Sequence, residues 1–284
     1  MFQVPFERSY HGVIFGFCGL RAYSTACAAV CLLQTASLHG LKGPMKILAF
    51  SLIVLAALPR PAKAEEVLLA VASNFVTAAE ELAEVFEAQS AHSVVVAHGS
   101  TGALYAQIIS GAPYDVFLSA DAERPRLLGD AGLAVAVKTY ALGRLVLVSK
   151  DPVDLEAAAE VFAGRRVALA DPMVAPYGAA AISAMEALAL DTATFQPLLV
   201  TNVGQVATLF VTGNAELAFL AEAQLPFIGA AKVTALDGRY PAIRQDAALL
   251  ARGVANPAAV AFWNFLSSDA AAEVISANGY DLAR

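Results

Sequence analysis

The sequence predicts an α/β protein of two lobes, each a mostly parallel sheet flanked by helices. Strand-like apolar runs alternate with helical patterns through residues 65–284, the order typical of parallel sheets. Turns rich in neutral hydrogen-bond donors occur in both halves of this stretch, which favours two lobes over a single domain. No fixed-period repeat and no low-complexity linker interrupts it.

The elements are short apolar strands, bounded by turn residues, and helices with one apolar face. In the first helix the apolar side chains of Phe75, Ala79, Leu82 and Phe86 recur at helical spacing. The expected strands are Val67–Ala72, Ser93–Ala97, Val116–Leu118, Leu142–Ser149, Arg166–Ala170, Leu198–Thr201, Glu216–Leu220 and Ala247–Leu250. The expected helices are Phe75–Gln89, Gly102–Ser110, Arg124–Asp130, a short one around Val161–Phe162, Gly178–Ala189, Val203–Thr212, Ala221–Gln224, Pro257–Ser267 and Ala270–Ala277. We expect 65–140 and 242–284 to form the first lobe and 141–241 the second.

Residues 45–64 have the pattern of a secretory signal peptide. Met45-Lys46 is a charged start, Ile47–Leu58 an apolar core, and Ala62-Lys63-Ala64 a small-residue cleavage box. The apolar core is short for a membrane span, and a short buried helix is the alternative interpretation. We expect cleavage after Ala64. Because the next residue is Glu65 and not cysteine, we expect a soluble periplasmic protein without a lipid anchor.

Residues 1–44 lie upstream of this complete signal. They contain all three cysteines, Cys18, Cys27 and Cys31, and no clear strand–helix pattern. We interpret them as the result of a start codon assigned too far upstream, with Met45 the true start. A genuine extension or a longer membrane-targeting segment is the alternative. The exported part then has no cysteine, so its stability must come from a hydrophobic core rather than from disulfides.

The charge of the exported part limits its partners. Residues 1–64 contain six of the 18 Lys and Arg but only one of the 25 Asp and Glu, so residues 65–284 carry 12 basic and 24 acidic side chains. Their net charge of −12 argues against nucleic acid, which requires a basic footprint. Any site for an anion must therefore be built from local dipoles and neutral donors.

Four short polar turns carry the functional signal. Each follows a predicted strand and opens a predicted helix, where free backbone N–H groups, the positive end of a helix dipole and hydroxyl donors come together. In open α/β sheets, ligands bind at the carboxyl ends of the parallel strands. The turns are Ser73-Asn74, Gly99-Ser100-Thr101-Gly102, Ala175-Pro176-Tyr177-Gly178 and Thr201-Asn202-Val203-Gly204.

Simpler interpretations apply to each residue alone. A Ser or Asn at a helix start is usually an N-cap that contributes about 1 kcal/mol, and a lone tyrosine such as Tyr177 is more often a packing residue. Asp115 and Asp121 are expected to cap turns. Arg124 and Arg126 are expected to form a solvated helix face.

Catalysis and metal binding are disfavoured by the residue types present. Residues 65–284 contain two histidines, His92 and His98, and no Gly-x-Ser-x-Gly elbow. A secreted serine hydrolase that uses Ser100 is therefore the remote alternative. Two histidines without cysteine or paired ligand spacing predict neither a catalytic site, nor a metal site, nor a cofactor.

A more specific signal lies in the runs around these turns. The chain reads ASNF at 72–75, GSTGALYAQI at 99–108 and GAPYDVFLSAD at 111–121, and then DP at 171–172, APYG at 175–178 and NVGQ at 202–205. In this order the runs resemble the molybdate-binding periplasmic proteins of ABC transporters. The resemblance covers essentially all of residues 65–284 and nothing in residues 1–44.

The resemblance implies a two-lobed periplasmic binding protein that closes on a tetrahedral dianion, molybdate or tungstate, held by hydroxyls and backbone amides. It implies Ser73, Asn74 and Ser100 as ligand-binding residues of the first lobe, and the turn at Tyr177 with the amide of Val203 in the second. Some members add a tyrosine hydroxyl from a later strand. The matching stretch here, 217–221, has no tyrosine, and Asn74 is the implied replacement donor.

The same resemblance implies the partners: an inner-membrane ABC permease with its cytoplasmic ATPase, bound by a monomeric protein. A permease-docking surface is the alternative interpretation of Arg124 and Arg126. A site made only of donors suits a permanent dianion, which has only acceptors. No Asp or Glu lies within the four turns, so we expect discrimination against hydrogen phosphate, whose proton would lack an acceptor. Binding of another oxyanion, such as sulfate or thiosulfate, is the closest alternative, because cavity size separates these ligands.

Overall fold

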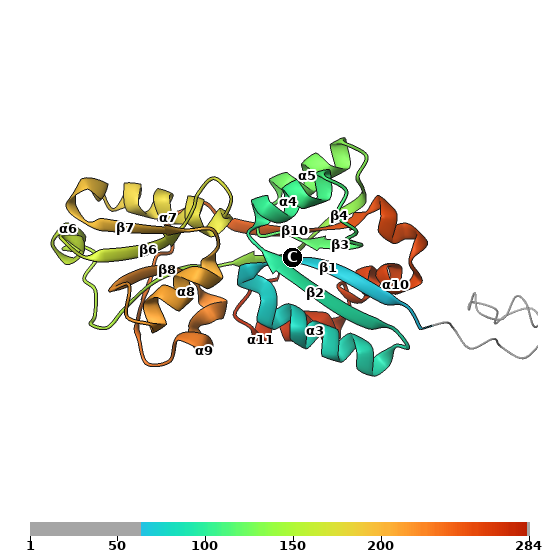
Figure 1. The fold of residues 1–284 in the computed structure, drawn as a ribbon. Coiled ribbons are helices and arrows are strands. Elements are labelled where there is room, and N and C mark those ends of the chain that lie inside the picture. Colours follow the sequence, from blue (N-terminus) through green and yellow to red (C-terminus); the bar gives the residue numbers. More distant parts are fainter. Residues whose placement is uncertain (1–63, 283–284) are drawn as a thin grey trace, which may run out of the picture. The chain divides into compact units, whose positions relative to one another are not determined.

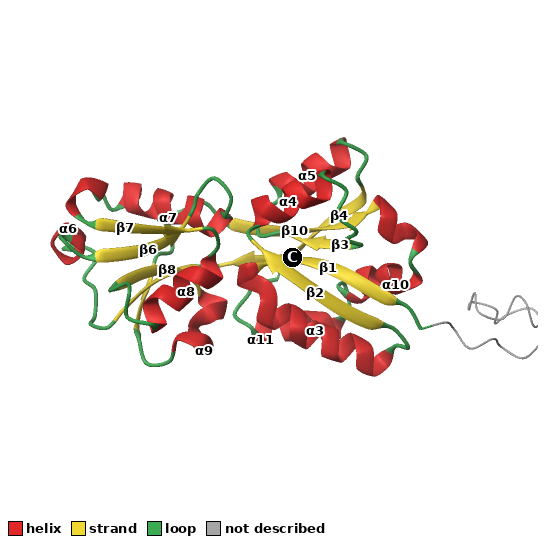
Figure 2. Ribbon diagram, in the orientation of Figure 1, coloured by secondary structure: helices red, strands yellow, loops and turns green. Residues whose placement is uncertain are grey.

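The computed structural model describes residues 64–282, which belong to one compact unit, Lys63–Arg284. Two five-stranded sheets, each flanked by helices, form its two lobes (Figures 1 and 2). The segment 1–44 and the predicted signal peptide at 45–64 lie outside the described residues, apart from Ala64. Within the described residues, no helix is long and apolar enough to cross a membrane.

The first sheet has the strand order β2-β1-β3-β10-β4. The central strand β1 (Glu66–Ala72) is parallel to β2 (Ser93–Gly99) and β3 (Val116–Leu118). The strand β10 (Ile243–Leu250) is antiparallel to both of its neighbours, β3 and β4 (Ala134–Gly143). Four of the five strands therefore run in one direction, and β10 runs against them.

Helices cover both faces of this sheet. One face packs against α3 (Val76–Gln89), α10 (Pro257–Phe265) and α11 (Asp269–Ala277), and the other against α4 (Thr101–Ile109) and α5 (Glu123–Asp130) (Figure 1). Two short 3₁₀ helices complete the lobe, η1 (Ser73–Phe75) after β1 and η4 (Ala251–Ala255) after β10. The apolar faces of these helices bury Phe75, Leu82, Leu104, Leu128 and Phe262 completely or nearly so.

The second sheet repeats this plan with the order β7-β6-β8-β5-β9. Its members are β7 (Gln196–Val200), β6 (Arg166–Ala170), β8 (Leu217–Ala221), β5 (Leu145–Ser149) and β9 (Lys232–Ala235). The pairs β7–β6 and β6–β8 are parallel, and β5 is antiparallel to β8 and β9. Again four strands share a direction and one opposes them.

The helices of the second lobe lie on both sides of its sheet, with α7 (Pro176–Ala187) and α8 (Val203–Val211) on opposite faces (Figure 1). Smaller elements are α6 (Ala158–Phe162), η2 (Thr192–Thr194), η3 (Glu222–Gln224) and α9 (Leu225–Ile228). The short α7–β6 distance depends on Gly178, where a Cβ atom would lie only 2.2 Å from the Ala170 carbonyl oxygen.

The predicted α/β fold with two mostly parallel sheets is confirmed, with corrections in detail. The single strand predicted at Leu142–Ser149 is wrong, because β4 and β5 are separate strands of different sheets with Arg144 between them. Most of β4, and all of β9, had no counterpart in the prediction. β4 begins with the apolar run Ala134–Val137 but continues through the polar pair Lys138–Thr139, and β9 has only four residues. The helix predicted at 221–224 begins one residue later, as η3, because β8 continues through Ala221.

The chain crosses between the sheets twice. It leaves the first sheet after Gly143 and enters the second at Leu145, and it returns between Ala235 and Ile243. These crossings bring β4, β5 and β10 close to the carboxyl ends of the strands that precede the four polar turns.

Candidate functional site

The four polar turns follow neighbouring parallel strands. In the first sheet, Ala72 at the end of β1 is paired with Gly99 at the end of β2. In the second sheet, Ala170 at the end of β6 is paired with Val200 at the end of β7. Each pair of turns therefore lies side by side at the carboxyl edge of its sheet, as the sequence predicts.

Residues from all four turns line one small buried cavity between the two lobes. Its walls are Ala72, Ser73, Asn74, Ser100, Thr101, Ala120, Ala175, Pro176, Tyr177 and Val203. All five residues predicted to bind the ligand are among them, and this described lining contains no Asp, Glu, Lys or Arg. The cavity volume is about 10 Å³, which is room for about one water molecule. A larger ligand therefore requires the walls to move apart.

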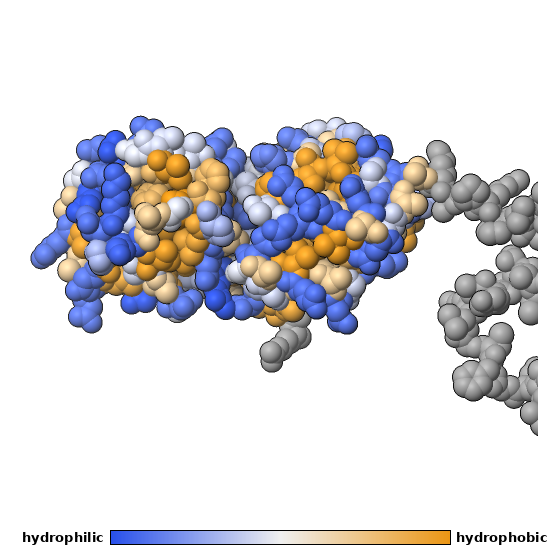
Figure 3. All heavy atoms as spheres, turned by 90° about the horizontal axis from the view of Figure 1, so that it is seen from below, coloured by the Kyte–Doolittle hydropathy of each residue, from blue (hydrophilic) through white to orange (hydrophobic). Residues whose placement is uncertain are grey.

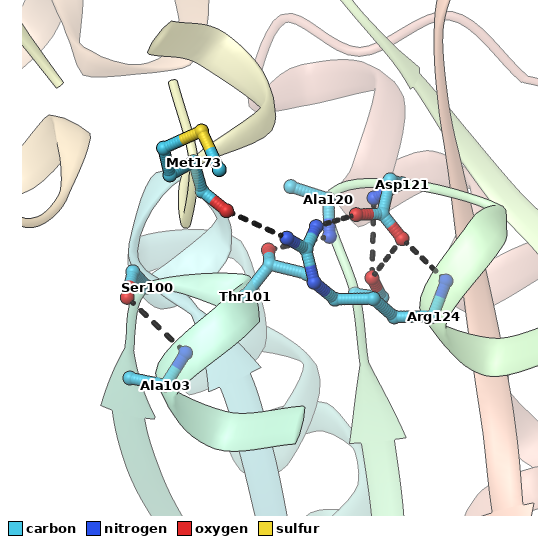
Figure 4. Close-up of polar contacts among 8 residues, drawn as sticks. Ser100, Thr101, Ala103, Ala120, Asp121, Arg124 and Met173 are labelled. Carbon is cyan, nitrogen blue, oxygen red and sulfur yellow. Dashed lines mark hydrogen bonds and ion pairs between the residues drawn. The ribbon is translucent and has the colours of Figure 1, made fainter. Parts of the chain in front are cut away.

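Three hydrogen-bond donors of this cavity sit at helix starts. Ser100 caps α4: its Oγ accepts a bond from the Ala103 N–H at 3.4 Å (Figure 4), so its hydroxyl hydrogen can still be donated. Tyr177 and Val203 lie in the first turns of α7 and α8, and their backbone N–H groups have no acceptor among the described residues. Such unpaired N–H groups are what a helix start offers to an anion.

The two lobes approach each other closely at Ser73. It opens η1 without a side-chain cap bond. Its Cβ lies 3.8 Å from the position that a Cβ on Gly204 of α8 would take. The side chain of Ser73 therefore lies beside the start of a helix of the opposite lobe.

Asn74 is buried, and its side chain is engaged inside the protein. Its Nδ2 donates to Gln245 Oε1 at 2.9 Å and to the Tyr280 hydroxyl at 3.1 Å. The Tyr280 hydroxyl in turn donates to the Asn74 carbonyl oxygen at 2.6 Å. Both hydrogens of Nδ2 are thus used, so Asn74 lines the cavity but its side-chain amide is not the free replacement donor that the sequence suggested.

The tyrosines around the site are uncharged. Burial raises the pKa of Tyr140 and Tyr177 well above the usual value, and burial also raises the pKa of Tyr280. For Tyr140, nearby Tyr280, Asp246 and Asp121 act in the same direction. The hydroxyls therefore remain protonated at neutral pH, which suits a site for a dianion because a phenolate would repel it.

Beside the cavity, two hydrogen bonds join the lobes. The Gly102 N–H at the start of α4 donates to the Val174 carbonyl at 2.8 Å. Arg124 Nη2 donates to the Met173 carbonyl at 3.1 Å, while the same guanidinium forms an ion pair with Asp121 (Figure 4). We call these four residues, Gly102, Arg124, Met173 and Val174, the clasp.

The clasp corrects the sequence prediction for Arg124. Arg124 is not part of a solvated face, because its side chain is only 21% exposed and bridges to the second lobe. Arg126 is exposed and pairs with Asp130, as expected for a solvated position. The capping role of Asp121 is confirmed, since its Oδ1 accepts the Arg124 N–H at 2.9 Å.

Asp115 has a different role from the predicted turn cap. Its Oδ2 accepts bonds from the Leu68 N–H and from Asn256 Nδ2, each at 3.0 Å. Asp115 therefore links β1, which lies earlier in the chain, to the start of α10, which lies much later in it.

Two wider grooves adjoin the cavity. One, of about 510 Å³, shares Ala120 and Pro176 with the cavity and also contains Arg124, Met173 and Arg244. The other, of about 830 Å³, shares Ser73 and Asn74 with it and includes residues of α3, α8, α9 and α11. Figure 3 views the molecule from below and shows hydrophilic side chains between its larger apolar areas.

The arrangement around Ser100 differs from that of a hydrolase. The Ser100 side chain contacts the Ala103 N–H, and none of its hydrogen bonds within residues 64–282 involves a histidine. His98 is exposed and lines the wider groove rather than the cavity. Among the described residues, no group of three or more His, Cys, Asp or Glu side chains could hold a metal ion.

Comparisons with known proteins give the family. A model described as bacterial extracellular solute-binding protein matches residues 67–281. The molybdate-binding protein ModA of Rhodobacter capsulatus is 41% identical over 239 residues, 82% of this chain and 94% of that protein. The ModA of Azotobacter vinelandii is 41% identical over 233 residues, 78% and 92% of the two chains.

A solved structure agrees with these relatives. The periplasmic molybdate-binding protein of A. vinelandii superposes with a TM-score of 0.69 at 34% identity, over 77% of this chain and 100% of that one. Two lobes that enclose a cavity of neutral donors define a class, that of ligand-capturing binding proteins. The chain belongs to the bacterial extracellular solute-binding protein family. Within that family it is similar to the molybdate-binding proteins named ModA.

Proposed function

We propose that this protein is the substrate-binding component of an ABC importer for molybdate or tungstate. The observation that carries the proposal is the uncharged cavity at which four strand-to-helix turns, two from each lobe, bring hydroxyl and amide donors together. The names of the ModA relatives supply the identity of the oxyanion.

The proposed ligand-binding residues are Ser73, Asn74, Ser100, Tyr177 and Val203. The hydroxyls of Ser73 and Ser100 and the N–H groups of Tyr177 and Val203 donate to the oxyanion. Asn74 forms part of the wall, held by Gln245 and Tyr280. Because hydrogen bonds to a charged acceptor are the stronger kind, four such donors can hold a dianion without a cationic side chain.

The same donor set explains selection against phosphate. Molybdate, tungstate and sulfate dianions present only acceptors, whereas hydrogen phosphate carries a proton that needs an acceptor. The described lining has no carboxylate to take that proton. Leaving a buried donor unpaired costs about 1–3 kcal/mol, so phosphate binds more weakly.

Binding requires a change in the separation of the lobes. The cavity has room for about one water molecule, and both adjoining grooves share residues with it. We propose that the lobes separate about the two chain crossings to admit the ligand. Closure then re-forms the clasp around it.

The cellular setting follows from the family and the sequence. We propose export through the signal peptide at 45–64, a periplasmic location, and action as a monomer that delivers its ligand to an inner-membrane permease and its cytoplasmic ATPase. The lobe boundaries, 65–140 with 242–284 and 141–241, remain a prediction, and the two sheet crossings support them approximately. The family is one of transport rather than catalysis.

Isothermal titration of the purified protein with molybdate, tungstate, sulfate, thiosulfate and phosphate tests the proposal. We expect tight binding of molybdate and tungstate, weaker sulfate and thiosulfate, and weakest phosphate. Sulfate or thiosulfate binding as tight as molybdate would establish the alternative ligand instead. Hydrolysis of an ester substrate that disappears in Ser100→Ala would replace the transport function with an enzymatic one.

A further inference from the structure

A buried glutamine side chain connects the two halves of the site. Gln245 on β10 is 0% exposed. Its Oε1 accepts a hydrogen bond from Asn74 Nδ2 of the first lobe at 2.9 Å. Its Nε2 donates to the hydroxyl of Tyr177 of the second lobe at 3.3 Å. One amide therefore contacts two residues that line the cavity, one from each lobe.

A second tyrosine fixes which way the amide points. The Tyr140 hydroxyl lies 3.1 Å from Gln245 Oε1 and 3.0 Å from the Ser119 carbonyl oxygen. Asn74 Nδ2 donates to Oε1, and the Tyr140 hydroxyl shares its single hydrogen between Oε1 and the Ser119 carbonyl oxygen. With its oxygen on this side, the amide directs Nε2 toward Tyr177. Because the Tyr177 oxygen accepts that bond, its own hydrogen must point elsewhere.

The backbone is irregular where this contact forms. Along β10, Gln245 is paired with Ala141 and Asp246 with Thr139, so Tyr140 is an extra residue in β4. An extra residue of this kind is a β-bulge, which redirects side chains and is frequent beside functional sites. The bulge lets Tyr140 share a face with Gln245.

The crossing between the sheets leaves space for the same contact. A Cβ atom on Gly143 would lie 2.1 Å from the Tyr177 hydroxyl oxygen and 2.6 Å from Gln245 Nε2. Any larger residue at this position would push the two groups apart. The contact between Gln245 and Tyr177 therefore depends on three positions of β4 and β10, which are Gly143, the bulge at Tyr140 and Gln245 itself.

We propose that Gln245 is a positioning residue of the oxyanion site, which sets the spacing of the two cavity walls by linking Asn74 to Tyr177. The inference rests on the proposed function, because its effect is on ligand affinity. Gln245 does not touch the ligand. It holds η1 and the start of α7 so that the donors of Ser73 and Tyr177 meet the oxyanion together.

The test is a double-mutant cycle measured by molybdate titration. Gln245→Met keeps the length of the side chain and removes both polar contacts, and Tyr177→Phe removes only the hydroxyl and keeps the backbone donor. We expect each change to weaken molybdate binding roughly 3- to 10-fold, the effect of losing one or two neutral hydrogen bonds. The double variant should bind molybdate no more weakly than the weaker-binding single variant, because both changes remove the same link between Gln245 and Tyr177.

Two further variants separate positioning from simple stability. Asn256→Ala removes another partly buried polar link, to Asp115 and the Glu66 carbonyl, away from the cavity. It should lower the midpoint of unfolding and leave the molybdate Kd unchanged. Gly143→Ala keeps Gln245 and Tyr177 intact but separates them, so it should weaken binding by a similar factor to Gln245→Met. It also provides the test if Gln245→Met does not fold.

The outcomes distinguish the two proposals. Wild-type protein that binds no molybdate would overturn the proposed function and this inference with it. If the wild type binds molybdate but Gln245→Met leaves the affinity unchanged, the inference alone is overturned. The same holds if Gly143→Ala and Tyr177→Phe both leave the affinity unchanged. Additive effects in the cycle would also overturn it, because independent losses mean that Gln245 and Tyr177 do not act through one another.

Discussion

The Ser100 hydroxyl is the donor whose contribution can be removed most cleanly. Its Oγ is only a weak cap for α4, since the bond from Ala103 N–H is 3.4 Å long. Ser100→Ala should therefore weaken molybdate binding by about 1.5–3 kcal/mol, the range for a hydrogen bond to a charged group, and change stability less. Titration calorimetry measures the first effect and thermal unfolding the second.

Ser110 supplies the matched control for that change. It lies at the other end of the same helix, and its hydroxyl donates to the Ala106 carbonyl at 2.8 Å on the exposed surface. Ser110→Ala should leave affinity unchanged. Equal affinity in the wild type and Ser100→Ala would remove Ser100 from the site.

Residues whose roles are local could be predicted from the sequence, and those with distant partners could not. Ser100 and Val203 stand at helix starts, which the pattern of strand, turn and helix reveals. The part played by Asn74 depends on Gln245, which lies 171 positions away, and on Tyr280, which lies 206 positions away. No short motif carries such a pairing. The sequence therefore placed Asn74 at the cavity but did not reveal the internal partners of its side-chain amide.

At the scale of elements, the clasp joins α4 and α5 to the segment that precedes α7. Arg124→Met should remove the bond to the Met173 carbonyl and release Asp121, while keeping most of the apolar length of the side chain. We expect molybdate to dissociate several-fold faster, because the closed form loses one of the two hydrogen bonds of the clasp. The expected change in affinity is about 1 kcal/mol, since the group is partly exposed to solvent.

Arg126→Met on the same helix is the control for the clasp. Within residues 64–282 its guanidinium pairs only with Asp130, and it is 62% exposed, so dissociation should remain as in the wild type. Stopped-flow displacement of molybdate from both variants measures the difference. Equal dissociation rates would show that the Arg124 contact does not contribute to closure.

The packing of α7 on β6 gives a second prediction at this scale. Gly178→Ala places a Cβ atom 2.2 Å from the Ala170 carbonyl oxygen, so the helix must move. We expect a loss of about 1–3 kcal/mol in the free energy of unfolding, typical of overpacking. Affinity should also fall, because the neighbouring Tyr177 N–H moves with the helix.

Gly129→Ala within α5 is the comparison for Gly178. The nearest atom to its added Cβ would be 4.0 Å away, and alanine is favoured over glycine in a helix by about 0.5–1 kcal/mol. Denaturant unfolding should therefore show unchanged or higher stability. A loss as large as that of Gly178→Ala would contradict the steric explanation.

The elements themselves show why prediction from sequence was uneven. Strands with apolar runs, such as β3 and β6, were located with their observed bounds. β4 combines the apolar run Ala134–Val137 with the polar pair Lys138–Thr139, and β9 has only four residues, so neither matches the pattern of a short continuous apolar strand. The break at Arg144 is equally hidden, because Val and Leu are frequent on both sides of the crossing and only the pairing partners differ.

For the whole molecule, the small cavity and the clasp predict a change in shape with ligand. Solution scattering should show a smaller radius of gyration with molybdate than without it, because closure brings the lobes together. The same measurement with phosphate at equal concentration is the control and should show no compaction. An identical radius in all three conditions would contradict closure on the ligand.

The uncharged cavity also has a consequence for kinetics. A dianion that approaches residues 65–284 meets a net charge of −12, while the donors act only at contact. Salt screens charges beyond roughly 10 Å at 0.1 M, so added sodium chloride should speed association and change dissociation little. A site lined with lysine or arginine behaves in the opposite way, because salt weakens its attraction. Such a protein does not concentrate anions in general, and only an anion that matches its donors remains bound.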